Sequence, residues 1–345
     1  MNQFVYDSTN RSGRIECDVL LTNRCNLSCR HCLYIERIPQ KKDLAASDFD
    51  ELLRRLEGTG AEVHLLGGEP LCREDIVDIV SEITRRGLVA KILTNGFVLT
   101  RSLMFRLKEA GLKGIGVSID GVRESHNINR GNSLAYDRVM NALELIKESG
   151  FPTKVSCAIH SGNRDSLCPL LLELDKKGVG RILVEHVLPI GHGRQLTGQN
   201  LSPDEWRGLI EEVHEFKERN HLSIRIAIQE VYSARNTSPF RCECLSGRFP
   251  VIDESGLLYP CIILYAADAS LSHISAFPDG LSALGARSTG FVSEIKSSLP
   301  QPYMHGRLEI KCPAVQRLVS QGGLNLDNVM ESDVVLGCFH KVILL

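Results

Sequence analysis

Short β-branched or aliphatic runs alternate with amphipathic helical patterns over the first 225 residues of this chain. Such alternation is typical of βα units that assemble a parallel sheet. Six runs predict strands, at residues 14–21, 62–66, 89–93, 114–119, 153–159 and 181–187. The segments between them place apolar residues at i, i+3, i+4 and i+7, which predicts helices with one buried stripe each. The predicted fold class is therefore α/β.

The ends of several predicted helices carry signals of their own. Ser202, Pro203 and Glu205 have the spacing of a capping box with proline at the first helical position. Glycines that suit a left-handed C-cap follow five of the other helical patterns: Gly58, Gly87, Gly111, Gly150 and Gly178. These signals support the helical assignments independently of the apolar stripes.

Periodicity alone fits both a partial barrel and a doubly wound open sheet. In both architectures, functional residues lie where the strands end. The chain places its least ordinary loop residues at that position after each of the first four predicted strands. These residues are Cys25, Cys29, Cys32, Gly67, Gly68, Glu69, Thr94, Asn95, Gly96, Ser118 and Asp120. We therefore expect one edge of the sheet to carry the functional site.

Twelve cysteines in a chain of 345 residues need a chemical explanation. The sequence shows no apolar segment typical of a signal peptide or a membrane span, which favours a cytoplasmic protein without a membrane partner. Disulfides are rare in that reducing compartment, so metal or redox chemistry becomes the leading interpretation. The isolated cysteines are instead expected to be small buried residues: Cys17, Cys72, Cys157 and Cys168. A formal net charge of −2 predicts no nucleic-acid partner.

Cys25, Cys29 and Cys32 form a C-x3-C-x2-C pattern in the polar stretch TNRCNLSCRHC. A structural zinc ion needs four ligands, and an ordinary cubane iron–sulfur cluster needs four cysteines. Three thiolates would leave one iron of such a cluster open to a small molecule. A zinc site completed by His31 or Cys17 is the alternative that the pattern alone leaves open.

Four motifs at four successive strand ends resemble those of the radical S-adenosylmethionine (radical SAM) enzymes. TNRCNLSCRHC resembles the cluster loop of that family, and LLGGEPL resembles its glycine motif. TNG resembles its element after the third strand, and VSIDG, with Arg130 and Gly131 downstream, resembles its ribose and carboxylate region. The resemblance covers roughly residues 14–225. It implies a partial (βα)6 TIM-like barrel in which the three cysteines bind a [4Fe-4S] cluster and SAM binds at the open iron.

The resemblance also implies which residues bind SAM: Gly67, Gly68, Glu69, Asn95, Ser118 and Arg130. The two glycines would let the backbone approach the ligand, and the glutamate would accept hydrogen bonds from its ammonium group. The serine offers a hydroxyl to the ribose, and the arginine offers a fork to the carboxylate. Two residues depart from the family pattern. His31 stands where an aromatic residue is usual, and Asn127 stands where aspartate is common, so Asn127 is given no role.

Three further polar residues lie in or at the end of predicted strands. His64 is inside a strand, and we expect a satisfied core histidine rather than a ligand. Glu185 and His186 follow the sixth strand and are candidates for lining the cavity.

The βα alternation stops after residue 225, and we place a domain boundary there. Residues 1–225 are predicted to form the barrel, and residues 226–345 a second, cysteine-rich domain. FPVIDESGLLYPC predicts a hairpin with its turn at Asp253–Gly256. The spacing C-x11-G-x4-C that starts at Cys244 resembles the beginning of the SPASM domain of radical SAM enzymes, or of its shorter twitch form.

By this second resemblance, the C-terminal domain holds one auxiliary [4Fe-4S] cluster. Its implied ligands are Cys244, Cys261, Cys312 and Cys338. Cys242 is an alternative to Cys244. The C-x2-C-x5-C-x3-C run of the full SPASM pattern does not follow Cys312, which favours the twitch form with a single cluster.

The two resemblances together imply an oxidoreductase that makes a 5′-deoxyadenosyl radical from SAM and abstracts hydrogen from its substrate. A donor such as flavodoxin or ferredoxin would supply the electron, and the auxiliary cluster would accept one from the substrate radical. Only about 13 residues precede the first predicted strand, so we expect no fused peptide-recognition domain there. This favours oxidation of an aminocyclitol or sugar alcohol.

Three alternatives remain at the level of the sequence. A peptide is the other candidate substrate. Epimerisation would need a hydrogen-atom donor, and Cys157 is the candidate if its side chain points into the barrel. A non-catalytic iron–sulfur or zinc-binding protein is the hypothesis from a different class. LLGGEP and VSIDG argue against it, because neither role needs a cavity for a nucleotide-like ligand.

Overall fold

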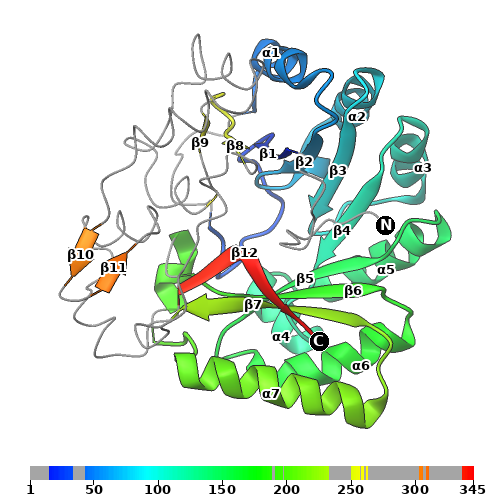
Figure 1. Ribbon diagram of the computed structural model, residues 1–345. Helices are drawn as coiled ribbons and strands as arrows, with labels where there is room; N and C mark the ends of the chain where they lie inside the picture. The colour runs from blue at the N-terminus through cyan, green and yellow to red at the C-terminus, as the bar shows by residue number, and fades with distance from the viewer. Residues whose placement is uncertain are drawn as a thin grey trace.

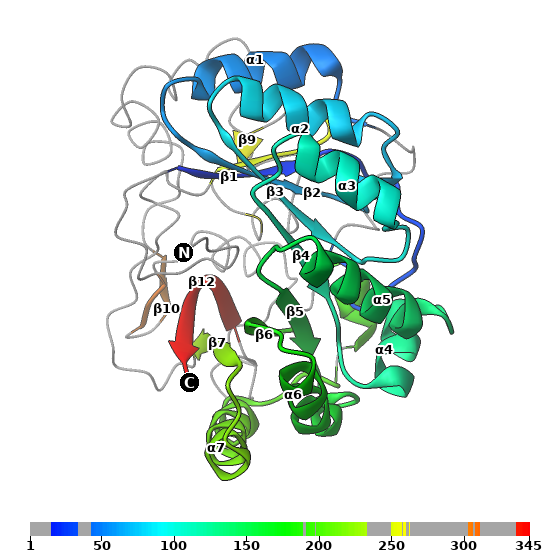
Figure 2. The same ribbon diagram turned by 90° about the vertical axis from the view of Figure 1, so that its right-hand side faces the viewer.

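The computed structural model describes most of the predicted barrel and parts of the sequence after it. The described residues are 15–33, 43–188, 191–196, 198–232, 250–256, 258–259, 262, 303–305, 308–310 and 336–345. Parallel strands form the centre of one curved sheet, and helices cover its outer face (Figures 1 and 2). No helix in the described part of the chain is long and apolar enough to cross a membrane.

The central strands follow one another across the sheet in sequence order, each parallel to the next. They are β1 (Glu16–Leu20), β2 (Glu62–Leu66), β3 (Val89–Thr94), β4 (Gly114–Ser118), β5 (Lys154–Ile159), β6 (Arg181–His186) and β7 (Arg225–Tyr232). The described strands run from edge to edge without closing, which confirms the predicted partial barrel. All six predicted strands are present. β7 was missed, although RIAIQEVY carries alternating apolar residues typical of a strand.

The described helices are α1 (Ala46–Leu56), α2 (Ile76–Arg85), α3 (Arg101–Glu109), α4 (Arg123–Arg130), α5 (Ala135–Glu148), α6 (Leu167–Lys176) and α7 (Pro203–Asn220). All except α4, whose buried residues are polar, bury apolar stripes as the sequence predicts. Three 3₁₀ helices accompany them: η1 (Pro70–Cys72), η2 (Arg164–Ser166) and η3 (Gly191–Leu196). In α1, for example, Phe49, Leu52 and Leu56 are buried in the core. The five predicted C-cap glycines all have positive φ, which confirms that prediction.

Segments from the second half of the chain extend both edges of this sheet. At one edge, β8 (Val251–Ile252) pairs with β1 in parallel and with β9 (Leu258–Tyr259) in an antiparallel hairpin, as predicted. At the other edge, β12 (Leu336–Leu344) pairs with β7 in an antiparallel arrangement. Strands β10 (Tyr303–His305) and β11 (Leu308–Ile310) form a separate pair.

The predicted domain boundary at residues 225 and 226 falls at the start of β7, a strand of the main sheet. The division into 1–225 and 226–345 therefore stays a prediction. Most of the cysteines assigned to an auxiliary cluster lie outside the described residues: Cys242, Cys244, Cys261 and Cys312. Cys338 lies on β12, directly after Gly337, which pairs with Val231 of β7.

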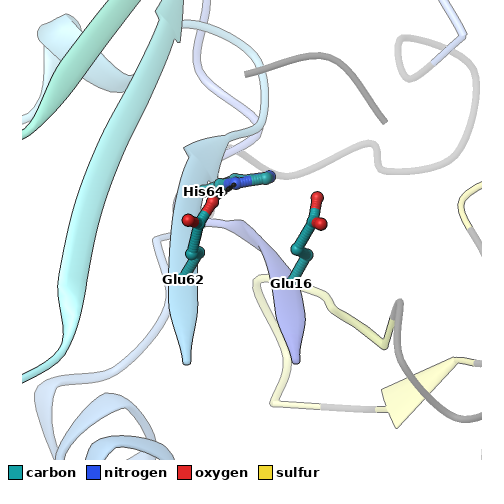
Figure 3. Close-up of side chains that lie close together, drawn as sticks. All are labelled: Glu16, Glu62 and His64. Atoms are coloured by element: carbon teal, nitrogen blue, oxygen red, sulfur yellow. Dashed lines mark ion pairs between the residues drawn. The ribbon is translucent and has the colours of Figure 1, made fainter. Parts of the chain in front are cut away.

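The inner face of the barrel carries buried charge on β1 and β2. Glu16 and Glu62 lie close to His64, and Figure 3 shows the three side chains between the two strands. His64 Nδ1 lies 3.2 Å from Asp18 Oδ1, and Glu62 is ion-paired with Lys91. Burial alone would lower the pKa of His64, but its hydrogen bonds to Asp18 and Glu62 raise it above its usual value. His64 is therefore buried with carboxylate partners, as predicted for a core histidine, and the expectation that it binds no metal stays a prediction.

The predicted capping box at the start of α7 is also confirmed. Ser202 Oγ accepts a hydrogen bond from the Glu205 amide at 3.2 Å, and the Ser202 amide donates to Glu205 Oε2 at 2.7 Å. The next residue, Trp206, is fully buried and donates from Nε1 to the Gln229 carbonyl of β7 at 2.9 Å. The cap therefore fixes the helix end that anchors β7.

Replacing Ser202 with alanine should lower the free energy of unfolding by about 1 kcal/mol, because the Glu205 amide loses its acceptor. Thermal unfolding of the metal-free protein, with hydrogen exchange at the Glu205 amide, measures the effect. Ser102→Ala on the exposed face of α3 is the control. Equal exchange at Glu205 in Ser202→Ala and in the control would contradict the assigned cap.

Candidate active site

A cavity of about 190 Å³ lies at the carboxyl ends of the strands. It is lined by every barrel residue that the sequence analysis assigned to the cluster or to SAM: Cys25, Cys29, Cys32, Gly67, Gly68, Glu69, Asn95, Ser118 and Arg130. Glu185 and His186 line it as well, which confirms that prediction. Motifs far apart in the sequence are thus gathered at one edge of the sheet.

The cysteine loop (residues 22–32) contributes three thiols to the lining of this cavity. Cys25 is exposed, Cys32 is partly exposed and Cys29 is buried. Asn95 Nδ2 lies 3.9 Å from the sulfur of Cys25, and Arg130 Nη1 lies 3.7 Å from that of Cys29. Burial raises the pKa of the Cys29 thiol. This thiol is therefore protonated unless a metal displaces the proton.

The donor set of this loop fits an iron–sulfur cluster better than one metal ion. A tetrahedral zinc ion with bonds of about 2.3 Å would hold its sulfur ligands roughly 4 Å apart. Among the described residues, the side chains whose potential ligand atoms all lie within 4.8 Å of one another are Glu16, Glu62 and His64. The three cysteines of the loop do not form such a group. Three thiols spaced around a cavity, with N–H groups directed at two of them, suit a cluster with one open iron.

The glycine motif packs directly against the backbone of the cysteine loop. The Gly68 amide donates to the Thr22 carbonyl at 2.7 Å, and the Glu69 amide donates to the Arg24 carbonyl at 2.8 Å. A Cβ on Gly67 would lie 2.3 Å from the Thr22 oxygen, and one on Gly68 would lie 2.2 Å from the Arg24 oxygen. The glycines were expected to admit the ligand. Their more immediate role is to let these two backbone segments touch.

Glu69 is buried and already accepts three hydrogen bonds. Oε1 accepts from the Leu71 amide at 3.0 Å and from Thr94 Oγ1 at 2.6 Å, while Oε2 accepts from the Asn95 amide at 2.7 Å. Burial raises its pKa above the usual value despite these donors. A carboxylate has about four acceptor sites, so roughly one remains for the ammonium group that the resemblance implies.

Arg130 lies at the cavity floor in a bidentate pair with Asp120. Nε is 2.6 Å from Oδ2 and Nη2 is 3.0 Å from Oδ1, and both residues are buried. Burial would raise the pKa of Asp120, but the charge of Arg130 lowers it to about 2. The sequence analysis assigned the Arg130 guanidinium to a ligand carboxylate and did not consider Asp120. Asp120 engages two of the three guanidinium nitrogens. The third nitrogen, Nη1, faces Cys29.

Two residues around this pair were left uncertain by the sequence. His31 Nε2 lies 3.5 Å from Asp120 Oδ2, and burial lowers the pKa of His31 to about 4, so its ring is uncharged at neutral pH. Asn127, given no role, donates from Nδ2 to the Ser133 carbonyl and accepts from the Tyr136 amide. Asn127 therefore holds the connection between α4 and α5.

The isolated cysteines mostly behave as small core residues. Cys17, Cys157 and Cys168 are buried, whereas Cys72 is partly exposed, contrary to expectation. Cys157 packs in the hydrophobic core, while its neighbours Ser156 and Ala158 line the cavity. Because side chains alternate along a strand, Cys157 faces the helices and not the cavity. A role for Cys157 as a hydrogen-atom donor required its side chain to point into the barrel, and it does not.

Ser156 on β5 and Glu185 on β6 form a polar pair that the motifs did not predict. The Ser156 hydroxyl donates to Glu185 Oε2. Burial, with the nearby charge of Asp120, raises the pKa of Glu185 to about 7. Alternation along β5 could have indicated this pair, because it puts Ser156 and the small Ala158 on the same face of the strand. Ser156 pairs with Ser118 at the end of β4.

Comparisons with known proteins agree with this geometry. Residues 19–168 match the family model described as the Radical SAM superfamily. Fe-coproporphyrin III synthase of Methanosarcina barkeri is 30% identical over 203 residues, or 58% of this chain and 51% of the relative. PqqA peptide cyclase of Gluconobacter oxydans is 29% identical over 250 residues, or 70% of this chain and 68% of the relative. The chain thus spans about half to two thirds of the length of these relatives.

Two solved structures share the fold at low sequence identity. Streptococcus suis SuiB bound to S-adenosylmethionine has a TM-score of 0.66 at 17% identity, covering 82% of this chain and 68% of SuiB. The enzyme anSMEcpe with bound AdoMet has a TM-score of 0.65 at 17% identity, covering 92% of this chain and 99% of that one. The part of the chain that matches the Radical SAM superfamily model, residues 19–168, contains the cysteine loop, the glycine motif and Arg130.

Proposed function

We propose that this chain is a radical SAM enzyme that modifies a peptide by hydrogen abstraction. The observation that carries the proposal is the gathering of three thiols, the glycine motif and the Asp120–Arg130 pair around one cavity. When bound, the cluster and SAM supply the 5′-deoxyadenosyl radical that abstracts the hydrogen atom. The chain's own residues bind and orient SAM and the substrate, and they exclude water.

The proposed roles follow from the contacts of each residue. Cys25, Cys29 and Cys32 hold the cluster. Glu69 accepts from the ammonium group of SAM with its remaining site, and Ser118 offers its hydroxyl to the ribose. Asn95 is well placed for a further contact with SAM, because its side-chain amide already lies beside the cysteine loop.

Arg130 acts in this proposal mainly as a fixed positive charge. Its pairing with Asp120 holds the guanidinium in place, so Nη1 stays directed at the sulfur of Cys29. Hydrogen bonds to cluster sulfurs tune the reduction potential of iron–sulfur sites. Contact with the carboxylate of SAM would have to use Nη1 or reorganise the pair.

The choice of a peptide replaces the aminocyclitol or sugar alcohol favoured by the sequence. PqqA peptide cyclase matches a larger share of this chain than Fe-coproporphyrin III synthase does. Among the solved structures, SuiB bound to precursor peptide SuiA and anSMEcpe with the Cp18Cys peptide have TM-scores of 0.66 and 0.64. These likenesses support a peptide substrate for this chain. Epimerisation loses its candidate donor, because Cys157 faces the core.

The remaining parts of the proposal concern electron transfer. The barrel, residues 1–225, would receive an electron from a donor such as flavodoxin or ferredoxin. Residues 226–345 would form a SPASM- or twitch-like domain whose auxiliary [4Fe-4S] cluster is held by Cys244, Cys261, Cys312 and Cys338. An oxidoreductase outcome needs such an acceptor for the electron of the substrate radical. A non-catalytic iron–sulfur protein would not need the cavity beside the cysteine loop.

Replacing Cys25, Cys29 and Cys32 together with alanine should reduce 5′-deoxyadenosine formation by about a hundredfold or more, because no ligand of the open cluster remains. Anaerobic incubation of the reconstituted protein with SAM and dithionite, followed by chromatography, measures the nucleoside. Cys168→Ala, a buried cysteine on α6, is the matched control. Undiminished 5′-deoxyadenosine from the triple variant would refute the assignment of the cysteine loop.

Iron analysis tests the auxiliary cluster separately. Two cubane clusters imply roughly eight irons per reconstituted chain, and the triple variant should retain about half. Replacing Cys244 and Cys261 with alanine should likewise remove about half. A wild-type content near four irons that the Cys244 and Cys261 changes do not lower would eliminate the auxiliary cluster.

Gly68→Ala should weaken SAM binding by about tenfold or more, because its Cβ would meet the Arg24 carbonyl and displace the cysteine loop. Equilibrium dialysis of the reconstituted protein with labelled SAM measures the affinity. Gly208→Ala on α7, where a new Cβ meets nothing within 4 Å, is the control. If both variants bind SAM as the unchanged protein does, the contact between the two backbone segments is not needed for the site.

A further inference from the structure

Ser156 and Glu185 lie on a part of the cavity wall that the proposed cluster and SAM contacts do not use. The cysteine loop follows β1, and the assigned SAM contacts come from the ends of β2, β3 and β4 and from α4. β5 and β6 lie beyond β4 in the sheet order. Their contribution to the cavity consists of Ser156, Ala158, Glu185, His186 and the two residues that follow.

Among the carboxyl groups that line this cavity, Glu185 has the fewest hydrogen-bond donors and charge partners within the described residues. Among the described residues, three carboxyl groups line the cavity, and the other two are already engaged. Glu69 accepts three hydrogen bonds, and Asp120 is paired with Arg130 and also accepts from the Ala158 amide at 3.1 Å. For Glu185, the described residues provide one hydroxyl donor, from Ser156.

Positive charge is scarce on the same wall. Arg130 is the arginine or lysine that lines the cavity within the described residues, and it is paired with Asp120. His186, the histidine of this wall, has a pKa that burial lowers to about 4, so its ring is uncharged at neutral pH. A cation that enters the cavity would therefore hold Glu185 in its ionised form.

We propose that Glu185, oriented by the Ser156 hydroxyl, binds a primary ammonium group of the substrate. The proposal deepens the function proposed above and rests on it. A carboxylate only accepts hydrogen bonds, and an ammonium group carries three donors with the opposite charge. In a cavity shielded from water such a pair is worth more than at a surface. The same ammonium chemistry is found on a lysine side chain of a peptide and on a free amino-alcohol.

Three small probes test this proposal on the holoenzyme with SAM bound. Nα-acetyl-lysine amide carries the ammonium group, Nα-acetyl-norleucine amide lacks it at similar length, and trans-2-aminocyclohexanol represents an amino-alcohol. Anaerobic calorimetry measures the dissociation constant of each probe. The unchanged protein should bind the lysine probe about tenfold more tightly than the norleucine probe.

Glu185→Gln should abolish this preference with little change in shape, and Ser156→Ala should reduce it by a few-fold. Glu212→Gln, on the outer face of α7, is the matched control and should retain it. Both cavity variants should bind SAM as tightly as the unchanged protein does. Melting temperatures confirm that each variant is folded.

Three results would overturn the proposal. These are equal binding of the lysine and norleucine probes to the unchanged protein, a preference that survives in Glu185→Gln, or a tenfold loss of SAM affinity in Glu185→Gln. The last would assign Glu185 to SAM. A Glu185-dependent preference for aminocyclohexanol without one for the lysine probe would support the ammonium site and refute the peptide substrate. Absence of SAM cleavage would refute the proposed function, and it is measured separately.

Discussion

The contact between the cysteine loop and the glycine motif is the constraint on which the site depends. Two backbone hydrogen bonds join residues 22–24 to Gly68 and Glu69. The two segments lie so close together that neither Gly67 nor Gly68 has room for a Cβ atom. Glu69, fixed by that contact, accepts from Thr94 and Asn95. The ends of three neighbouring strands thereby become one rigid unit. The positions of the thiols are set by backbone geometry, which is more precise than side-chain packing alone.

The helix after β4 fixes the other end of the same loop. The Arg30 amide donates to the Asn129 carbonyl at 2.9 Å, and Gly131 lies so close to Ser28 that a Cβ there would be 2.7 Å from its carbonyl oxygen. Arg130 lies between Asn129 and Gly131 in the chain. Its side chain pairs with Asp120 and faces the sulfur of Cys29. The loop is thus held on both sides by backbone contacts.

Much of this architecture could be predicted from local sequence. The six strands, the capping box at Ser202 and the gathering of the motifs at one edge follow from periodicity and from the rule that parallel strands present their carboxyl ends together. The pairing of Arg130 with Asp120 could not be predicted, because a fork for a ligand and a fork for a neighbouring carboxylate look alike in sequence. The direction of the Cys157 side chain depended on which face of β5 points into the barrel, and periodicity leaves that choice open.

The two edges of the sheet have a consequence for how the chain folds. β12 pairs with β7 and β8 pairs with β1, so both edges of the barrel are completed by segments from the second half of the sequence. Leu336 reaches Tyr232 across a long stretch of chain, and contacts between such distant residues form slowly because closing the loop costs entropy. Until they form, two strands expose unpaired backbone groups that can template aggregation. A shortened chain that retains only the βα units would keep those open edges permanently and should therefore be more prone to aggregate.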